Sequence, residues 1–139
     1  MSHDPNCIFC KIIAGEAPGH LVHEDELTVT IMDAFPASEG HALVITREHH
    51  ANIYEIPEAT LCAVAAQSKR VAAALERELS PDGLGIYQLN GSAAGQTVSH
   101  YHMHVIPRSE GQKRSVHGRE PADDKRQKEL AERLRAALK

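Results

Sequence analysis

Three histidines stand at alternate positions late in the chain: His100, His102 and His104, in the run SHYHMHVIP. In an extended strand successive side chains point to opposite faces, so the three imidazoles are predicted to share one face. The residues between them are apolar and are expected to pack against a core. A neutral imidazole can act as a nucleophile or as a metal ligand. The run therefore predicts either a nucleophilic site that handles phosphate or a three-histidine metal site.

A loop with two glycines, residues 90–98 (NGSAAGQTV), comes directly before these histidines. Glycine lets backbone N–H groups approach an anion closely, and Gln96 and Thr97 add side-chain donors. The alternative is an ordinary hairpin loop, because Gly, Ser and Asn are common in turns. Beside three histidines, the loop favours a phosphate cradle.

Cys7 and Cys10 form a CxxC motif near the N-terminus. Such a motif is typical of a redox pair or of half a zinc site. A redox motif opens a helix just after a strand, and only six residues precede Cys7, so the metal site is favoured. The third cysteine, Cys62, falls in a predicted helix and is expected to be a small buried hydrophobic residue. Three cysteines do not make a disulfide framework.

Length and composition limit the class of protein. A chain of 139 residues predicts one domain with a core of useful size. The net charge of −4 argues against nucleic acid as a partner. Neither a signal sequence nor a run long enough to span a membrane is found, so we expect a cytoplasmic protein without a membrane partner.

The hydrophobic pattern predicts an α+β protein, an antiparallel sheet with helices packed on it. Strands are expected at residues 20–24, 28–33, 41–46 and 84–90 and along the histidine run to Pro107, with a long helix from Pro57 to the breaker residues 80–83. The run 41–46 is almost continuously apolar, as in a strand buried on both faces. After a polar, basic stretch at 108–120, Leu130, Leu134 and Leu138 indicate a last helix.

The segment LNGSAAGQTVSHYHMHVIPR resembles the signature of the histidine triad (HIT) family of nucleotide hydrolases and transferases. The resemblance continues through CIFCKIIAGE, LVHEDELTVTIMDAFPASEGHALVI and REHH, and is strongest to bacterial-type members with an N-terminal CxxC, similar to HINT-like hydrolases. It implies a HIT domain at residues 7–108 with an antiparallel sheet of about five strands and two main helices. It also implies a homodimer through the sheet and the long helix. Residues 109–139 are then a polar loop and a C-terminal helix that packs on the body or on the dimer partner.

The same resemblance implies that His102 attacks the α-phosphorus of a purine nucleotide substrate and forms a nucleotidyl-histidine that water hydrolyses. His104 is implied to stabilise the phosphate oxygens, and His100 and Thr97 complete the catalytic set. Expected substrates are adenosine phosphoramidates, adenylylated amines or dinucleoside polyphosphates, with no catalytic metal required. Thr97 replaces a common serine but keeps the hydroxyl that can protonate a leaving group.

The resemblance also assigns nucleotide contacts. Asp33 is implied to accept the ribose hydroxyls, and Ile31 and Phe35 to lie beside the base. The phosphate and the leaving group are implied to be held, together with His102 and His104, by Asn90, Gly95, Gln96, Thr97 and Val98.

A structural zinc ion is implied by the CxxC branch of the family, with Cys7, Cys10, His49 and His100 as ligands. His50 is the alternative to His49. The remaining histidines are interpreted as surface or packing residues: His3, His20, His23, His41 and His117.

Two other functions remain open. The chain can be a nucleotide-binding dimer that acts as a sensor or scaffold, because binding needs the same residues as slow hydrolysis. It can also be a metal hydrolase with zinc on the three histidines. The basic residues Arg108, Lys113 and Arg114 either approach an acidic leaving group or are simply solvated.

Overall fold

The computed structural model describes residues 3–138, and within that range it holds a single five-stranded sheet and three α-helices. This confirms the predicted α+β class. In chain order the elements are α1 (Ile8–Ile13), β1 (Leu21–Glu24), β2 (Thr28–Met32), β3 (Ala42–Thr46), α2 (Glu58–Leu79), β4 (Gly83–Tyr87), a 3-10 turn (Ser92–Ala94), β5 (His102–Arg108) and α3 (Asp124–Ala137).

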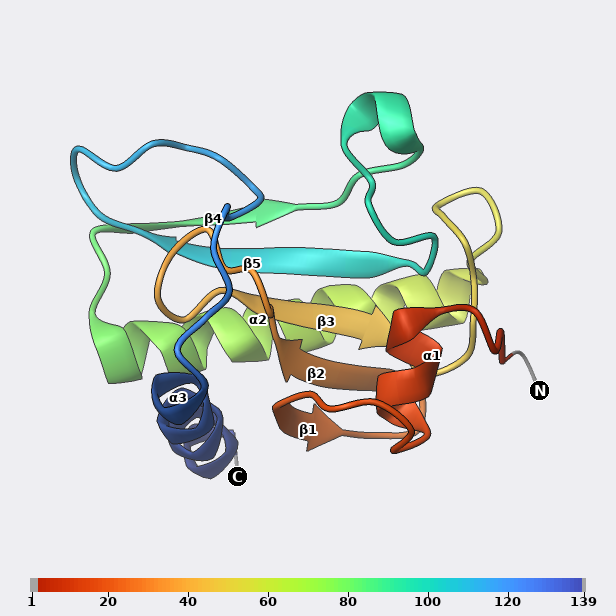
Figure 1. Ribbon diagram of the computed structural model, residues 1–139, viewed down its shortest axis with the longest axis horizontal. Coiled ribbons are helices and arrows are strands. Elements are labelled where there is room, and N and C mark those ends of the chain that lie inside the picture. Colours follow the sequence, from red (N-terminus) through yellow and green to blue (C-terminus); the bar gives the residue numbers. More distant parts are fainter. Residues whose placement is uncertain (1–2, 139) are drawn as a thin grey trace.

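The strands are all antiparallel and lie in the order β1-β2-β3-β5-β4. The histidine strand β5 is therefore interior, between β3 and the edge strand β4 (Figure 1). Ile45 is opposite His102 and Leu43 is opposite His104 in the register of β3 with β5. Since side chains opposite each other share a face, these apolar residues of β3 floor the site beside the histidines.

Both faces of the sheet are covered, which is why β3 is buried along its whole length. Figure 1 shows α2 behind the sheet and α1 in front of it. Ala42 and Val44 belong to the core on the α2 side, whereas Leu43 and Ile45 belong to a second core with α1. The continuous apolar run at 41–46 correctly predicted such a strand.

The long helix α2 begins after Pro57 and ends at Leu79, and the next residue, Ser80, stops it with a positive φ of 45°. Its buried face contains Val64, Val71 and Leu75 and packs in the same core as Tyr101 and Val105 of the histidine run. The apolar residues that alternate with the histidines therefore pack against a core, as predicted, and that core is the one formed with α2.

Cys62 is exposed, so the expectation that it is buried was wrong. Thr60 and Val64 lie on the buried face of α2. A residue two positions from each is turned by about 200°, to the opposite side of the helix.

Most strand boundaries agree with the expected ones to within one residue, and two larger differences shape the site. Strand β4 ends at Tyr87 rather than Asn90, because the side chains of Gln88 and Asn90 hydrogen-bond to each other at 2.7 and 3.0 Å and turn the chain away. Strand β5 begins only at His102. His100 lies just before it, in a bend where its N–H donates to Val98 O.

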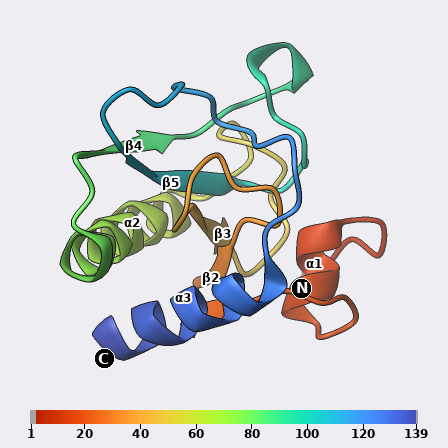
Figure 2. The same ribbon diagram turned by 60° about the vertical axis from the view of Figure 1, so that its left-hand side comes forward.

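The tail returns across the sheet to the opposite edge. Figure 2 shows the segment before α3 passing beside the loop that joins β2 and β3. Helix α3 then packs against α2 and β1, with Leu130, Ala131 and Leu134 buried in the α2-side core. Within residues 3–138, no helix is long and apolar enough to cross a membrane.

Candidate active site and metal centre

A cavity of about 640 Å³ lies on the α1 side of the sheet. Its apolar lining includes Phe9 and Ile12 of α1 with Ile31 and Leu43 of the sheet. Its polar lining includes Thr97, His102, His104 and His117. A lining with both characters suits a ligand that carries an apolar ring and an anionic group.

The backbone fixes the tautomer of His102. Its Nδ1 lies 2.6 Å from the carbonyl oxygen of His100, and because a carbonyl only accepts, Nδ1 carries the proton. The lone pair is therefore on Nε2. The ring is held from the side by Phe9, edge-on at 5.0 Å between centroids. A neutral imidazole held in this orientation with a free Nε2 lone pair has the chemistry that a nucleophile needs.

His104 is fixed in the opposite tautomer by a fourth histidine, His41. The N–H of Ala37 donates to His41 Nδ1 at 2.9 Å, so the His41 proton is on Nε2. That Nε2 lies 2.9 Å from His104 Nδ1 and donates to it. His104 therefore carries its proton on Nε2, which is buried and has no partner within residues 3–138. A donor held in this way is suited to a phosphate oxygen.

Burial keeps these rings neutral at physiological pH. It is the largest cause that lowers the pKa of His41 to about 3 and of His104 to about 3, and it also lowers the pKa of His102. For His41 the next cause is the nearby charge of Arg108, and for His104 it is His102. Neutral rings preserve both the lone pair of His102 and the single proton of His104.

Asp33 closes the chain of polar groups behind His104. One carboxylate oxygen accepts from the N–H of Phe35 at 2.9 Å, and the other lies 3.3 Å from His41 Nε2. Burial raises the pKa of the Asp33 carboxyl. Asp33, Ile31 and Phe35 all line the cavity, Phe35 with half of its surface exposed.

The glycine loop contributes two residues to the cavity lining, and its other polar side chains form hydrogen bonds that hold the loop in place. Thr97 and Val98 line the cavity. Gln96 instead accepts from Gly91 N–H at 2.8 Å and donates to Val98 O at 3.0 Å. Asn90 accepts from the N–H of Ile53 at 2.8 Å. Asn90, Gly95 and Gln96 are not among the cavity-lining residues that the structure describes, and Gly95 has the positive φ of 102° that the loop requires.

Two histidines interpreted from sequence as surface or packing residues contact the histidines of the cavity. The burial of His41 agrees with a packing residue, whereas the position of His117 in the cavity lining was not expected. His41 is fully buried against His104. His117 lines the cavity, edge-on to His104 at 5.6 Å between centroids. For His41 a signal existed, because it shares the parity, and hence the face, of Leu43 and Ile45. For His117 the sequence carried none.

The four candidate zinc ligands lie together, with all their ligand atoms within 4.8 Å of one another. The Sγ of Cys7 is 3.3 Å from His100 Nδ1, and the Sγ of Cys10 is 3.4 Å from His49 Nδ1 and 3.5 Å from His100 Nδ1. Tetrahedral zinc with bonds of about 2.0–2.3 Å separates neighbouring ligand atoms by about 3.3–3.8 Å. The group fits a structural zinc ion.

The surroundings of this group favour metal binding as well. His100 Nε2 donates to Thr46 O at 2.6 Å, which leaves Nδ1 free as a ligand, and Cys7 Sγ accepts from Cys10 N–H at 3.5 Å. Burial, as the largest cause, raises the pKa of the Cys10 thiol to about 11, so a thiolate here needs a cation. His49 rather than His50 belongs to the group.

A zinc ion shared by all three triad histidines is not supported. Among residues 3–138, the ring nitrogens of His100, His102 and His104 do not form one ligand group. The reason is that His100 turns toward the cysteines, while His102 donates to a backbone oxygen and His104 accepts from His41.

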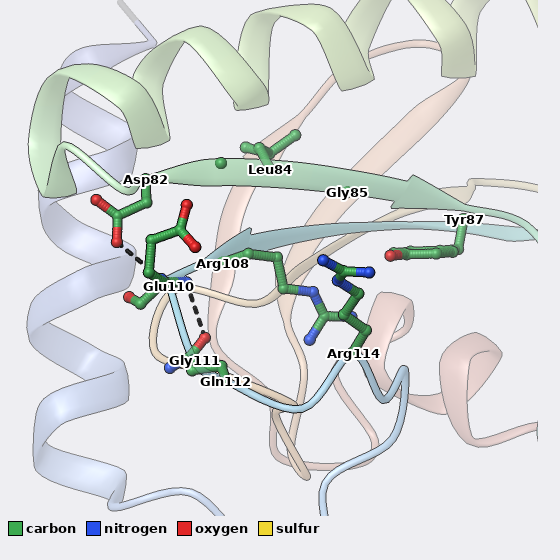
Figure 3. Close-up of a pocket in the computed structure, with 11 residues that line it drawn as sticks. Asp82, Leu84, Gly85, Tyr87, Arg108, Glu110, Gly111, Gln112 and Arg114 are labelled. Atoms are coloured by element: carbon green, nitrogen blue, oxygen red, sulfur yellow. Dashed lines mark hydrogen bonds between the residues drawn. The ribbon is translucent and has the colours of Figure 1, made fainter.

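A second, smaller hollow of about 280 Å³ lies at the β4 edge (Figure 3). Arg108 and Arg114 line it, and the Arg108 guanidinium lies 5.7 Å from the centre of the Tyr87 ring. The Nη2 of Arg108 also donates to Ser115 O at 2.5 Å. Arg108 and Arg114 thus lie beside this edge hollow and not among the lining residues of the histidine cavity.

The fold and the site define a histidine triad protein, and comparison with known sequences agrees. A sequence model of the HIT domain matches residues 14–111. The chain is 44% identical over 103 residues to the protein hit of Bacillus subtilis, covering 74% of this chain and 71% of that protein. It is 36% identical over 105 residues to adenylylsulfatase HINT3 of Arabidopsis thaliana, covering 76% of this chain and 53% of that protein. The chain belongs to the HIT family, as its motifs indicated.

Solved structures extend the similarity to the whole chain. A HIT-like protein involved in cell-cycle regulation from Bartonella henselae superposes with a TM-score of 0.88 at 34% identity, over 99% of each chain. A zinc-bound histidine triad family protein from Mycobacterium smegmatis superposes with a TM-score of 0.83 at 40% identity, over 96% of this chain and 93% of that one. The fold is therefore the HIT fold, including the tail.

Proposed function

We propose that this protein cleaves the bond between the α-phosphate of a purine nucleotide and its leaving group, through a nucleotidyl intermediate on His102. The observation that carries the proposal is the 2.6 Å bond from His102 Nδ1 to His100 O, which leaves the Nε2 lone pair for phosphorus. Substrates are AMP joined to an amine or to a further phosphate. The relative named adenylylsulfatase HINT3 supports an AMP-containing substrate.

In the first step His102 Nε2 attacks the α-phosphorus, the P–N(His) bond forms and the bond to the leaving group breaks. His104 Nε2–H donates to a phosphate oxygen, and Thr97 Oγ1–H can protonate the leaving atom. In the second step water attacks phosphorus and gives one proton to Thr97 Oγ1, which restores the hydroxyl; the P–N(His) bond breaks, and AMP leaves with His102 neutral again. Asp33 accepts hydrogen bonds from the ribose hydroxyls, and Ile31 and Phe35 contact the base. Asn90, Gly95 and Gln96 hold the loop that presents Thr97 and Val98.

The test is intact mass spectrometry after incubation with an adenosine phosphoramidate, quenched at neutral to alkaline pH. Wild-type protein should gain the mass of an AMP group, and His102→Ala should not, although it still binds AMP. Nucleotide binding without adduct or turnover in the wild type would contradict the enzyme and favour the alternative, a nucleotide-binding sensor or scaffold.

We also propose that Cys7, Cys10, His49 and His100 hold a structural zinc ion. Such an ion would tie α1 to the start of β5 and so support the position of Phe9 against His102. The zinc-bound relative from Mycobacterium smegmatis supports this. No step of the proposed reaction passes through the metal.

The homodimer is proposed at the β4 edge and the outer face of α2. Among the described residues, strand β4 pairs only with β5. Its other edge can therefore pair with a second copy of the chain. Ile86 of β4 is 47% exposed, and the outer face of α2 carries small residues. Sedimentation should show a dimer for the wild type and a monomer for Ile86→Lys; a monomeric wild type would contradict the proposal.

A further inference from the structure

The tail crosses the mouth of the histidine cavity as a short strap, residues 115–122. It hydrogen-bonds to two different loops. His117 Nε2 donates to Gly95 O in the glycine loop at 2.8 Å. In the loop between β2 and β3, Phe35 O accepts from Gly118 N–H at 3.0 Å and Ala34 O accepts from Ala122 N–H at 2.9 Å. The strap therefore joins the glycine loop to the loop between β2 and β3, and Figure 2 shows it passing beside the latter.

The strap lies beyond the matched HIT domain, which ends at residue 111, and yet it and the start of α3 supply part of the cavity wall. The lining residues from this part of the chain are His117, Gly118, Pro121, Ala122, Asp124 and Gln127. The fit at Gly118 is close: a Cβ there would lie 2.1 Å from Pro36 O. A glycine is thus needed for the crossing, because any side chain would push the strap off the loop.

We propose that His117 is a specificity-determining residue that contacts the phosphate of the bound nucleotide, so that the strap completes the phosphate site of the proposed enzyme. His117 lines the cavity edge-on to His104, whose Nε2–H is buried without a partner among residues 3–138 and is the proposed donor to the phosphate. A charge on His117 lowers the pKa of His102, His104 and Asp33, which agrees with its position close to all three.

The hydrogen bond to Gly95 determines which nitrogen of His117 faces the ligand. Because a carbonyl only accepts, Nε2 carries a proton and is used for the strap. Nδ1 is then the nitrogen for the ligand. In the proposed contact Nδ1 also carries a proton and donates to a phosphate oxygen, since both ring nitrogens can be donors. The ligand class is an anionic phosphate, and not the base.

Isothermal titration calorimetry with AMP and with adenosine tells whether His117 contacts the phosphate or only lines the cavity. His117→Ala should weaken AMP binding about tenfold, as expected for one charge-assisted hydrogen bond, and leave adenosine binding within about twofold. His117→Gln can still donate to Gly95 O but lacks the second ring nitrogen, so it should bind AMP as weakly as the alanine variant. Arg119→Ala, a change of a neighbouring cation that does not line the cavity, is the matched control and should bind AMP as the wild type does.

Three results would overturn the inference: equal losses for AMP and adenosine, no loss in either His117 variant, or full AMP affinity in His117→Gln. The inference rests on the proposed function, and the two can fail separately. A wild type that binds no AMP refutes both. A wild type that binds AMP and forms the His102 adduct, with His117 variants that bind AMP normally, refutes only the role of His117.

Discussion

Replacement of His41 tests the hydrogen-bonded chain that fixes His104 as a donor. His41 is fully buried, accepts from Ala37 N–H and donates to His104 Nδ1, both at 2.9 Å. In His41→Leu both groups lose their partner at similar side-chain volume. At about 1–3 kcal/mol for each unsatisfied group, the variant should lose about 2–6 kcal/mol of stability. That is a large part of the 5–15 kcal/mol typical of a domain, so the variant is destabilised but can still fold.

Catalysis should fall as well, because His104 is no longer held with its proton toward the phosphate. Loss of one preorganised donor to a developing anion costs about 100- to 1,000-fold in kcat. Since His104 itself remains, we expect a fall of about 10- to 100-fold in His41→Leu. In His41→Gln the amide Nε2–H can replace the ring donor, so kcat should fall less than about tenfold.

The assay is single-turnover release of AMP from an adenosine phosphoramidate at pH 7.5, with urea unfolding measured on the same samples. A folded His41→Leu variant with wild-type kcat would refute the reasoning that His41 holds His104. Equal losses of kcat in the leucine and glutamine variants would show that His41 acts through packing and not as a hydrogen-bond donor.

Three further predictions concern the histidines and the metal. Nitrogen-15 spectra at pH 7.5 should show His102 protonated on Nδ1 and His104 on Nε2; the reverse pair would contradict the assigned bonds. The pKa of His41 and of His104 is lowered to about 3, so the unfolded chain binds more protons between about pH 3 and 6.5, and stability falls as pH falls through that window. Urea unfolding at pH 5 should show a loss of about 2 kcal/mol for each ring, and a stability that does not change between pH 7.5 and 5 would be inconsistent with neutral buried rings. Native mass spectrometry should find one zinc ion in the wild type and in the exposed control Cys62→Ser, and none in Cys10→Ser; zinc retained by Cys10→Ser would exclude that ligand set.

Much of the fold follows from local patterns. The continuous apolar run at 42–46 and the helical spacing of Val64 and Leu75 predicted elements that the structure contains, because burial on one or two faces requires those patterns. The end of β4 at Tyr87 did not follow, since it depends on the side-chain pair Gln88 and Asn90. Cys62 was misjudged because the pattern left open which side of α2 is buried.

The site divides in the same way. The alternation of His100, His102 and His104 with apolar residues was enough to place three imidazoles on one face, because strand geometry alone requires it. Their different chemistry was decided by tertiary neighbours: a backbone oxygen for His102, His41 for His104, and the cysteines with Thr46 for His100. His41 reached its position because β3 pairs with β5, and His117 because the tail crosses the cavity. A tautomer and a cavity wall depend on which groups meet across long stretches of sequence, and only the folded chain determines that.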